Sequence, residues 1–166
     1  MYGPLPYTKF GNGEVYNPYD SQEVIYNSFF EELNEAIEAL YDMYQKDSSV
    51  KVLEKYDFVY SGNVESWLRF ANSLKLRLAM RIVYVNENLA KQKAEEAVNS
   101  EIGVMTANSD GAYHKIVDHN PWERFMPNWK DARISADLIC YMNGYSDPRR
   151  GAYYGISTFS SEGAYK

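Results

Sequence analysis

One stretch constrains the fold more than any other, residues 67–82, which read W-L-R-F-A-N-S-L-K-L-R-L-A-M-R-I. It contains no glycine or proline, and Ile82 is its one β-branched residue, so a helix is favoured over a strand. On a helix, the apolar side chains of this stretch and its continuation occupy two opposed faces. One face comprises Trp67, Ala71, Leu74, Leu78, Ile82 and Val85, and the other comprises Leu68, Leu76, Ala79, Met80 and Val83. A helix with two apolar faces is normally covered on both, which predicts an inner helix of a bundle or a helical solenoid.

The rest of the pattern predicts a mainly α-helical chain. Asp20, followed three residues later by Glu23, is typical of a capping box, with Asp20 as the N-cap of a helix. Asn63 is the expected N-cap of the central helix, and Gly144 is expected to stop the last helix. We expect helices at about 21–44, 63–85, 89–99 and 133–143, and irregular aromatic loops at 100–132 and 145–166. Within the first loop, residues 103–111 favour a short strand and a turn.

Composition excludes several classes of function. The chain has 166 residues, which suits one domain or a large piece of one. Its net charge of −6 argues against binding to nucleic acids, which needs a basic face. The single cysteine, Cys140, excludes an internal disulfide and a cysteine-based metal cluster. No apolar run is long enough to span a bilayer, and the opening residues, M-Y-G-P, do not read as a signal peptide.

Several segments together resemble the SusD/RagB-like nutrient-binding lipoproteins of the Bacteroidetes outer membrane. The central helix carries the most specific likeness, in W-x-x-F-A-N-S-L-K-L-R-L-A-M-R. The order of the surrounding segments is also similar to the family. These segments are an acidic helix opening with Y-D-S-Q-E at Tyr19, A-E-E-A at 94–97, G-V-M-T-A-N at 103–108 and D-P-R at 147–149. The resemblance covers most of residues 17–150.

The resemblance implies a scaffold of tetratricopeptide-like helix pairs, a SusD-like α/α superhelix, that carries an irregular ligand-binding part. It implies noncatalytic capture of a glycan at the cell surface, for delivery to a SusC-like TonB-dependent transporter of the outer membrane. A peptide ligand, as in some members of the family, remains an alternative, and so does a purely structural scaffold. We expect no enzyme activity, no cofactor and no metal.

The family pattern also bears on the extent of the domain. Members are much longer, and they begin with a lipoprotein signal and an acylated cysteine, whereas Cys140 lies within a predicted helix. We therefore expect residues 1–166 to be a single internal fragment of a SusD-like domain. Association with the membrane is expected only through a lipid anchor outside this sequence.

A noncatalytic sugar site needs flat rings that cover the apolar faces of pyranoses, together with side chains that form hydrogen bonds. The chain has 16 tyrosines and three tryptophans. The candidate ligand-binding residues are Trp122 and Trp129 in a loop bracketed by prolines and Tyr153 and Tyr154 in the tail, followed by Tyr113 and Tyr145. The alternative is that Trp122 and Trp129 anchor their loop onto the helices, because tryptophans are highly buried on average.

Two residues of the central helix have structural interpretations. Trp67 is expected in the core, at the head of the main apolar face. Arg81 lies at the margin of that face and is expected to pair with a carboxylate or with carbonyl groups. The nearby cations, Lys75 and Arg77, do not by themselves indicate a phosphate site.

The loop after residue 100 contains weaker candidates for a metal or a catalytic site. His114 and His119 lack a partner nucleophile or a known catalytic motif, so solvated or structural roles are favoured. Asn108, Asp110 and Asp118 could supply oxygen ligands to calcium, but they lack the ordered spacing of a known calcium loop.

Overall fold

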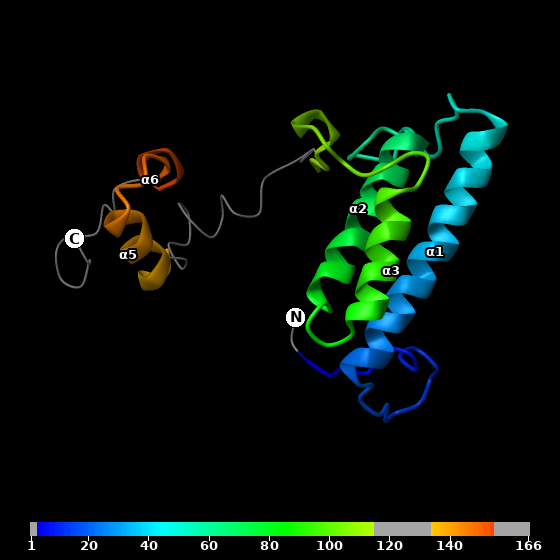
Figure 1. Ribbon diagram of the computed structural model, residues 1–166, viewed down its shortest axis with the longest axis horizontal. Coiled ribbons are helices and arrows are strands. Elements are labelled where there is room, and N and C mark those ends of the chain that lie inside the picture. The colour runs from blue at the N-terminus through cyan, green and yellow to red at the C-terminus, as the bar shows by residue number, and fades with distance from the viewer. Residues whose placement is uncertain (1–2, 115–133, 155–166) are drawn as a thin grey trace. The chain divides into compact units, whose positions relative to one another are not determined.

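The computed structural model describes residues 3–114 and 134–154 (Figure 1). The chain divides into two compact units, Met1–Lys115 and Ile116–Lys166, and each is described by itself. The predicted loop tryptophans, Trp122 and Trp129, lie outside the described residues. Among the described residues, the first unit has three long helices and the second has two short ones. None of the described helices is both long and apolar enough to cross a membrane. The prediction of a mainly α-helical chain is confirmed.

The first helix, α1, spans Gln22–Lys46, and its N-cap is Ser21 rather than the predicted Asp20. The Ser21 hydroxyl accepts a hydrogen bond from the backbone N–H of Val24, at 3.3 Å. Asp20 does not cap the helix, because its carboxylate accepts the backbone N–H groups of Tyr7 and Thr8 at 3.0 and 2.7 Å. The aspartate therefore anchors the amino-terminal segment, and the shorter serine caps the helix.

The central helix, α2, spans Val64–Arg81, with Asn63 as the predicted N-cap. It ends four residues before the predicted end at Val85. A turn follows, in which the N–H groups of Val85 and Asn86 donate to the carbonyl of Ile82. Val85, placed by the sequence on the main apolar face, is 87% exposed because the helix has ended before it. Asn86 then caps α3, Glu87–Val98.

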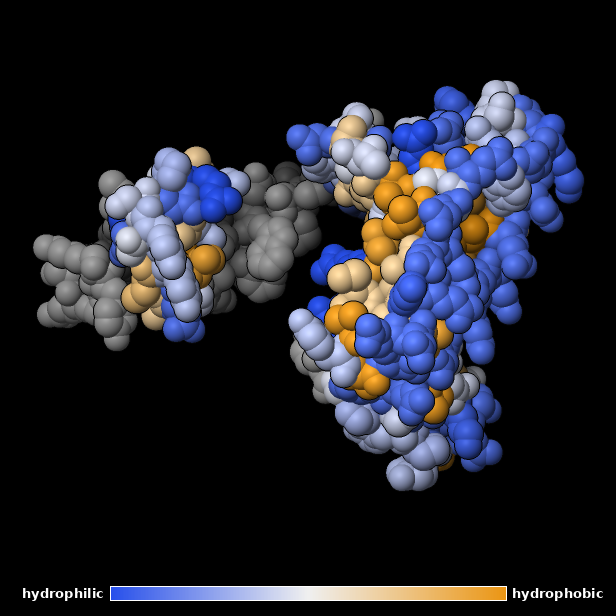
Figure 2. All heavy atoms as spheres, viewed as in Figure 1, coloured by the Kyte–Doolittle hydropathy of each residue, from blue (hydrophilic) through white to orange (hydrophobic). Residues whose placement is uncertain are grey.

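The inner position predicted for α2 is confirmed, since it packs against both α1 and α3. Phe30 of α1, which is 2% exposed, meets Leu78 and Ala79 of α2 in the core of this unit. Seven half-buried residues surround these three, namely Tyr26, Phe29, Leu33, Leu74, Ile82, Leu89 and Ala94. Figure 2 shows hydrophobic side chains in a band along the helices of this unit, bordered by hydrophilic ones. One apolar cluster, with side chains from all three helices, thus holds the unit together.

A buried lysine joins all three helices. Lys75 of α2 donates to Asn34 of α1 at 2.8 Å and pairs with Glu96 of α3 at 2.7 Å. Burial alone would raise the pKa of Glu96, but hydrogen bonds from Lys75, Lys93 and Gln92 lower it to about 2. Lys75 is therefore a structural cation, since a buried charge is tolerated where it is paired and hydrogen-bonded.

Polar side chains of α2 also hold the segment that follows α3. The buried amide of Asn72 donates to the hydroxyl of Ser100 at 2.7 Å and to the carbonyl of Gly103 at 2.9 Å. The hydroxyl of Ser73 accepts the N–H of Met105, at 2.8 Å. The prediction of a strand here is wrong, because these bonds direct the backbone to α2. A 3-10 helix, η1, follows at Asn108–Asp110.

The role of Asn72 can be tested by replacement. We expect Asn72→Ala to lower the free energy of unfolding by about 1–2 kcal/mol, because it leaves the Gly103 carbonyl and the Ser100 hydroxyl without this donor. Urea denaturation followed by circular dichroism measures the change. Asn88→Ala, at an exposed position of α3, is the matched control. Equal stabilities of the two variants would contradict the role of Asn72.

The second unit contains α5, Ala136–Gly144, and α6, Arg149–Tyr153. The hydroxyl of Ser135 caps α5, so this helix begins three residues later than predicted and includes Gly144 as its last residue. The predicted irregular tail contains α6, which is a correction. Asp147 starts this turn of helix by accepting the N–H and the guanidinium of Arg149, both at 2.9 Å.

Candidate functional site

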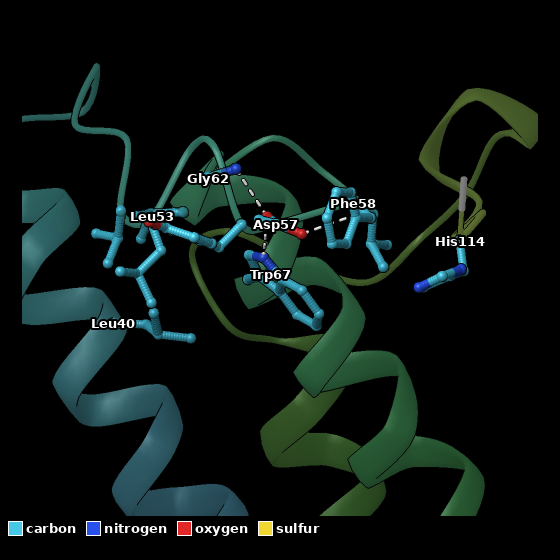
Figure 3. Close-up of a pocket in the computed structure, with 11 residues that line it drawn as sticks. Leu40, Leu53, Asp57, Phe58, Gly62, Trp67 and His114 are labelled. Carbon is cyan, nitrogen blue, oxygen red and sulfur yellow. Dashed lines mark hydrogen bonds between the residues drawn. The ribbon is translucent and has the colours of Figure 1, made fainter. Parts of the chain in front are cut away.

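A hollow of about 500 Å³ opens on the first unit, beside the loop that joins α1 to α2 (Figure 3). We call it the aromatic hollow. Its lining residues are Leu40, Val52, Leu53, Tyr56, Asp57, Phe58, Val59, Gly62, Val64, Trp67 and His114. The lining is mainly apolar, and its volume falls in the range of about 300–1,000 Å³ typical of small-molecule sites.

The carboxylate of Asp57 organises the wall of the aromatic hollow. It accepts the N–H groups of Val59 at 2.9 Å, Tyr60 at 3.1 Å and Gly62 at 2.7 Å, and the indole N–H of Trp67 at 2.8 Å. Burial tends to raise the pKa of Asp57, but these hydrogen bonds outweigh burial and lower it to about 2. A carboxylate offers about four lone-pair directions, so three N–H groups of the loop and the indole of Trp67 use its capacity as an acceptor.

A close approach of two backbone segments requires glycine at position 62. Gly62 has a φ of +79°, and a Cβ atom there would lie 2.7 Å from the carbonyl oxygen of Val52. The N–H of Val52 donates to the carbonyl of Gly62, at 3.0 Å. The two ends of the loop are therefore joined directly, and this contact positions Val52 and Leu53 at the edge of the hollow.

An aromatic cluster supports the floor of the hollow. The ring of Trp67 meets that of Tyr60 edge-to-face at 5.2 Å, and that of Phe70 at 5.6 Å. The hydroxyl of Tyr60 donates to the carbonyl of Asp110, at 2.9 Å. Trp67 was expected in the core, but it is half-buried and lines the hollow, because its indole N–H is used by Asp57.

The structure describes two of the four predicted ligand-binding residues. The rings of Tyr153 and Tyr154 lie edge-to-face with centroids 6.3 Å apart, in the second unit. Tyr153 is exposed and Tyr154 is half-buried. Trp122 and Trp129 lie outside the described residues, so their predicted role stays a prediction. The weaker candidates, Tyr113 and Tyr145, are both exposed.

Two of the metal and catalytic candidates, His114 and Asp110, make contacts that the structure describes. The ring of His114 lies 6.0 Å from that of Phe58, whereas His119 lies outside the described residues. Asp110 accepts the N–H groups of Thr106 and Ala107 at 2.9 and 3.0 Å. Within residues 3–114 and 134–154, no group of three or more His, Cys, Asp or Glu side chains could hold a metal ion.

Within the described part of the chain, Arg81 bonds to a hydroxyl group, whereas the sequence predicted a carboxylate or carbonyl partner. Its Nε donates to the hydroxyl of Tyr26 at 3.3 Å, rather than to a carboxylate or a carbonyl group. Arg81 is exposed, because α2 ends there and its side chain reaches across the end of the helix to α1. The exposed position lets water solvate the charge of the guanidinium.

Sequence reasoning missed the aromatic hollow as a site. The signal present was a run of alternating aromatic residues, Tyr56, Phe58 and Tyr60, within an otherwise polar connection. Alternation in a loop does not by itself indicate a pocket. The hydrogen bonds that Asp57 accepts from Gly62 and Trp67 hold this loop against α2, and spacing along the chain does not predict them.

The family model described as SusD-like, Susd and RagB outer membrane lipoprotein, matches residues 1–166. No curated protein matches significantly. A SusD homologue from Bacteroides ovatus is 51% identical over 95% of this chain and 32% of its own, with a TM-score of 0.79. A chitin-binding SusD homologue from Flavobacterium johnsoniae is 42% identical over 94% of this chain and 33% of its own, with a TM-score of 0.81.

A third structure, a SusD homologue from Bacteroides uniformis, is 47% identical over 92% of this chain and 32% of its own, with a TM-score of 0.77. The chain thus spans about a third of the length of the solved structures that it matches. The family match and the three solved structures agree, because all of them are SusD-like proteins. The chain belongs to the SusD-like family of outer membrane lipoproteins.

Proposed function

We propose that the protein binds glycans at the cell surface without catalysing a reaction on them. The observation that carries this proposal is the likeness to the chitin-binding SusD homologue, at 42% identity over 94% of the chain. The aromatic content supports it, because flat rings cover the apolar faces of sugars while hydroxyl groups bond outward. The carboxylate of Asp57, saturated by four N–H groups, supports binding rather than acid–base chemistry at the hollow.

The proposed ligand contacts include the four predicted residues, Trp122, Trp129, Tyr153 and Tyr154. In support, Tyr153 exposes its ring, and Tyr154 holds that ring edge-to-face. The proposed partner that receives the glycan is a SusC-like TonB-dependent transporter, and a lipid anchor would retain the protein at the outer membrane. Membership of a family of outer membrane lipoproteins supports this location.

Affinity electrophoresis against a panel of neutral and acidic polysaccharides tests the proposal. We expect at least one glycan to retard the protein, and the double variants Trp122→Ala/Trp129→Ala and Tyr153→Ala/Tyr154→Ala to bind it at least tenfold more weakly. Tyr84→Ala, at a fully exposed position of the first unit, is the control for ring loss elsewhere.

Each outcome separates the alternatives. If no glycan retards the protein and a peptide library yields a ligand, the peptide-binding alternative replaces the proposal. If neither kind of ligand binds, a structural scaffold is favoured. Unchanged affinity in both double variants, with circular dichroism spectra like that of the parent protein, would remove these four residues from the site.

A further inference from the structure

The aromatic hollow is large enough to hold a ligand, and its rings are accessible. Tyr56 is 76% exposed, and Phe58 is 43% exposed. Figure 3 shows Phe58 and His114 on one side of the hollow, Leu53 on the other, and Trp67 below them. A flat ligand with an apolar face could therefore contact several rings and still leave its edge in water.

The wall of the hollow is held in place before any ligand arrives. Asp57 fixes residues 59–62, the Gly62–Val52 contact closes the loop, and the bond from Tyr60 to the Asp110 carbonyl joins it to η1. Binding to a preorganised wall costs less conformational entropy than binding to a free loop. The exposed rings thus lie on a rigid support.

Charge decides what kind of ligand fits. Among the described lining residues, Asp57 is the one carboxylate and no lysine or arginine is present. In the same loop, Lys51 pairs with Glu54 at 2.5 Å, and Lys55 does not line the hollow. An anionic ligand would meet the negative charge of Asp57 without a cation to pair with. A cationic ligand would find the oxygens of Asp57 already bonded to four N–H groups.

We propose that the aromatic hollow is a subsite for an uncharged pyranose unit of a glycan, stacked on the rings of Tyr56 and Phe58. This subsite is additional to Trp122, Trp129, Tyr153 and Tyr154, and the inference rests on the proposed function. His114 adds an exposed imidazole to the lining, and an imidazole can form hydrogen bonds with sugar hydroxyl groups. Selectivity for neutral over anionic sugars follows from the charges of the lining.

Saturation-transfer NMR and calorimetry with defined trisaccharides test the subsite. The neutral probe is N,N′,N″-triacetylchitotriose, and the anionic probe is tri-galacturonate. We expect the parent protein to bind the neutral probe at least tenfold more tightly than the anionic one. The variant Tyr56→Ala/Phe58→Ala should bind the neutral probe about tenfold more weakly, because two stacking rings are lost.

Two control variants separate the loss of the stacking rings from a general effect of the substitutions. Tyr84→Ala removes an exposed ring that does not line the hollow and should bind like the parent protein. If the double alanine variant unfolds at a lower temperature, Tyr56→Leu/Phe58→Leu keeps apolar contact and removes only the rings. It should lose affinity to the same extent.

Three results would overturn the subsite. These are undiminished binding of triacetylchitotriose to both ring variants, equal affinity of the parent for tri-galacturonate, and occupation of the hollow by acetyl-Leu-Phe-Leu-amide but not by the sugar. Each leaves the proposed function standing if neutral polysaccharides still retard the parent protein. By contrast, a parent protein that binds no glycan at all would overturn the proposed function as well.

Discussion

Phe30→Ala is expected to lower the free energy of unfolding by about 3–5 kcal/mol. The ring of Phe30 is 2% exposed and is enclosed by Leu78 and Ala79 of α2, among a shell of half-buried residues. Truncation removes its transfer free energy and leaves a cavity, because helices held by a buried lysine cannot fully collapse into the space. Such a loss is a large part of the total stability of a typical domain.

Urea denaturation followed by far-ultraviolet circular dichroism measures this change. Phe10→Ala is the matched control, since Phe10 is exposed in the amino-terminal segment and should alter stability by less than about 0.5 kcal/mol. A loss of less than about 1 kcal/mol for Phe30→Ala would contradict the packing of α1 on α2.

Asp57→Ala is expected to lower the free energy of unfolding by about 3 kcal/mol at pH 7. The carboxylate accepts four N–H groups, three from its own loop and one from Trp67. Hydrogen bonds to a charged acceptor are the stronger kind, but they are not additive, and this carboxylate is partly solvated. The variant should also lose binding at the aromatic hollow, because Asp57 supports its wall.

The contribution of Asp57 should depend on pH in a defined direction. Its folded-state pKa is about 2, below the ordinary value of 3.8. A depressed pKa gives stability that is fully present above the unfolded value, near pH 4, and is lost as the pH falls through about 2. The pH-dependent part is at most about 2 kcal/mol after allowance for solvent screening.

Asp57→Asn isolates that part, because it keeps the shape of the side chain and removes the charge. We expect its urea midpoint to vary less between pH 5 and pH 2 than that of the parent protein. Asp42→Asn, at an exposed position of α1, should follow the parent at both pH values. If Asp57→Asn followed the parent as closely, the hydrogen bonds to this carboxylate would not account for its depressed pKa.

Local signals were sufficient to place the three long helices, but not α6, which lies in the predicted irregular tail. The stretch from Trp67 to Ile82 predicted an inner helix, and α2 packs on both sides as expected. Asn63 was correctly identified as its cap, because capping depends on neighbouring residues. The error at Asp20 has a longer-range cause, since Tyr7 and Thr8 compete for its carboxylate from outside the helix.

The sequence by itself determined the helical class, the family and the inner position of α2, because periodicity and the central motif are local properties of the chain. The tertiary structure decided the roles of individual polar residues in α2. Asn72 and Lys75 act through partners 28 and 41 residues away in the sequence. Trp67 lines the aromatic hollow and is not a core residue, because its indole N–H donates to Asp57, ten residues earlier. The spacing of residues along the chain does not predict such contacts, because they form only when distant segments pack against α2.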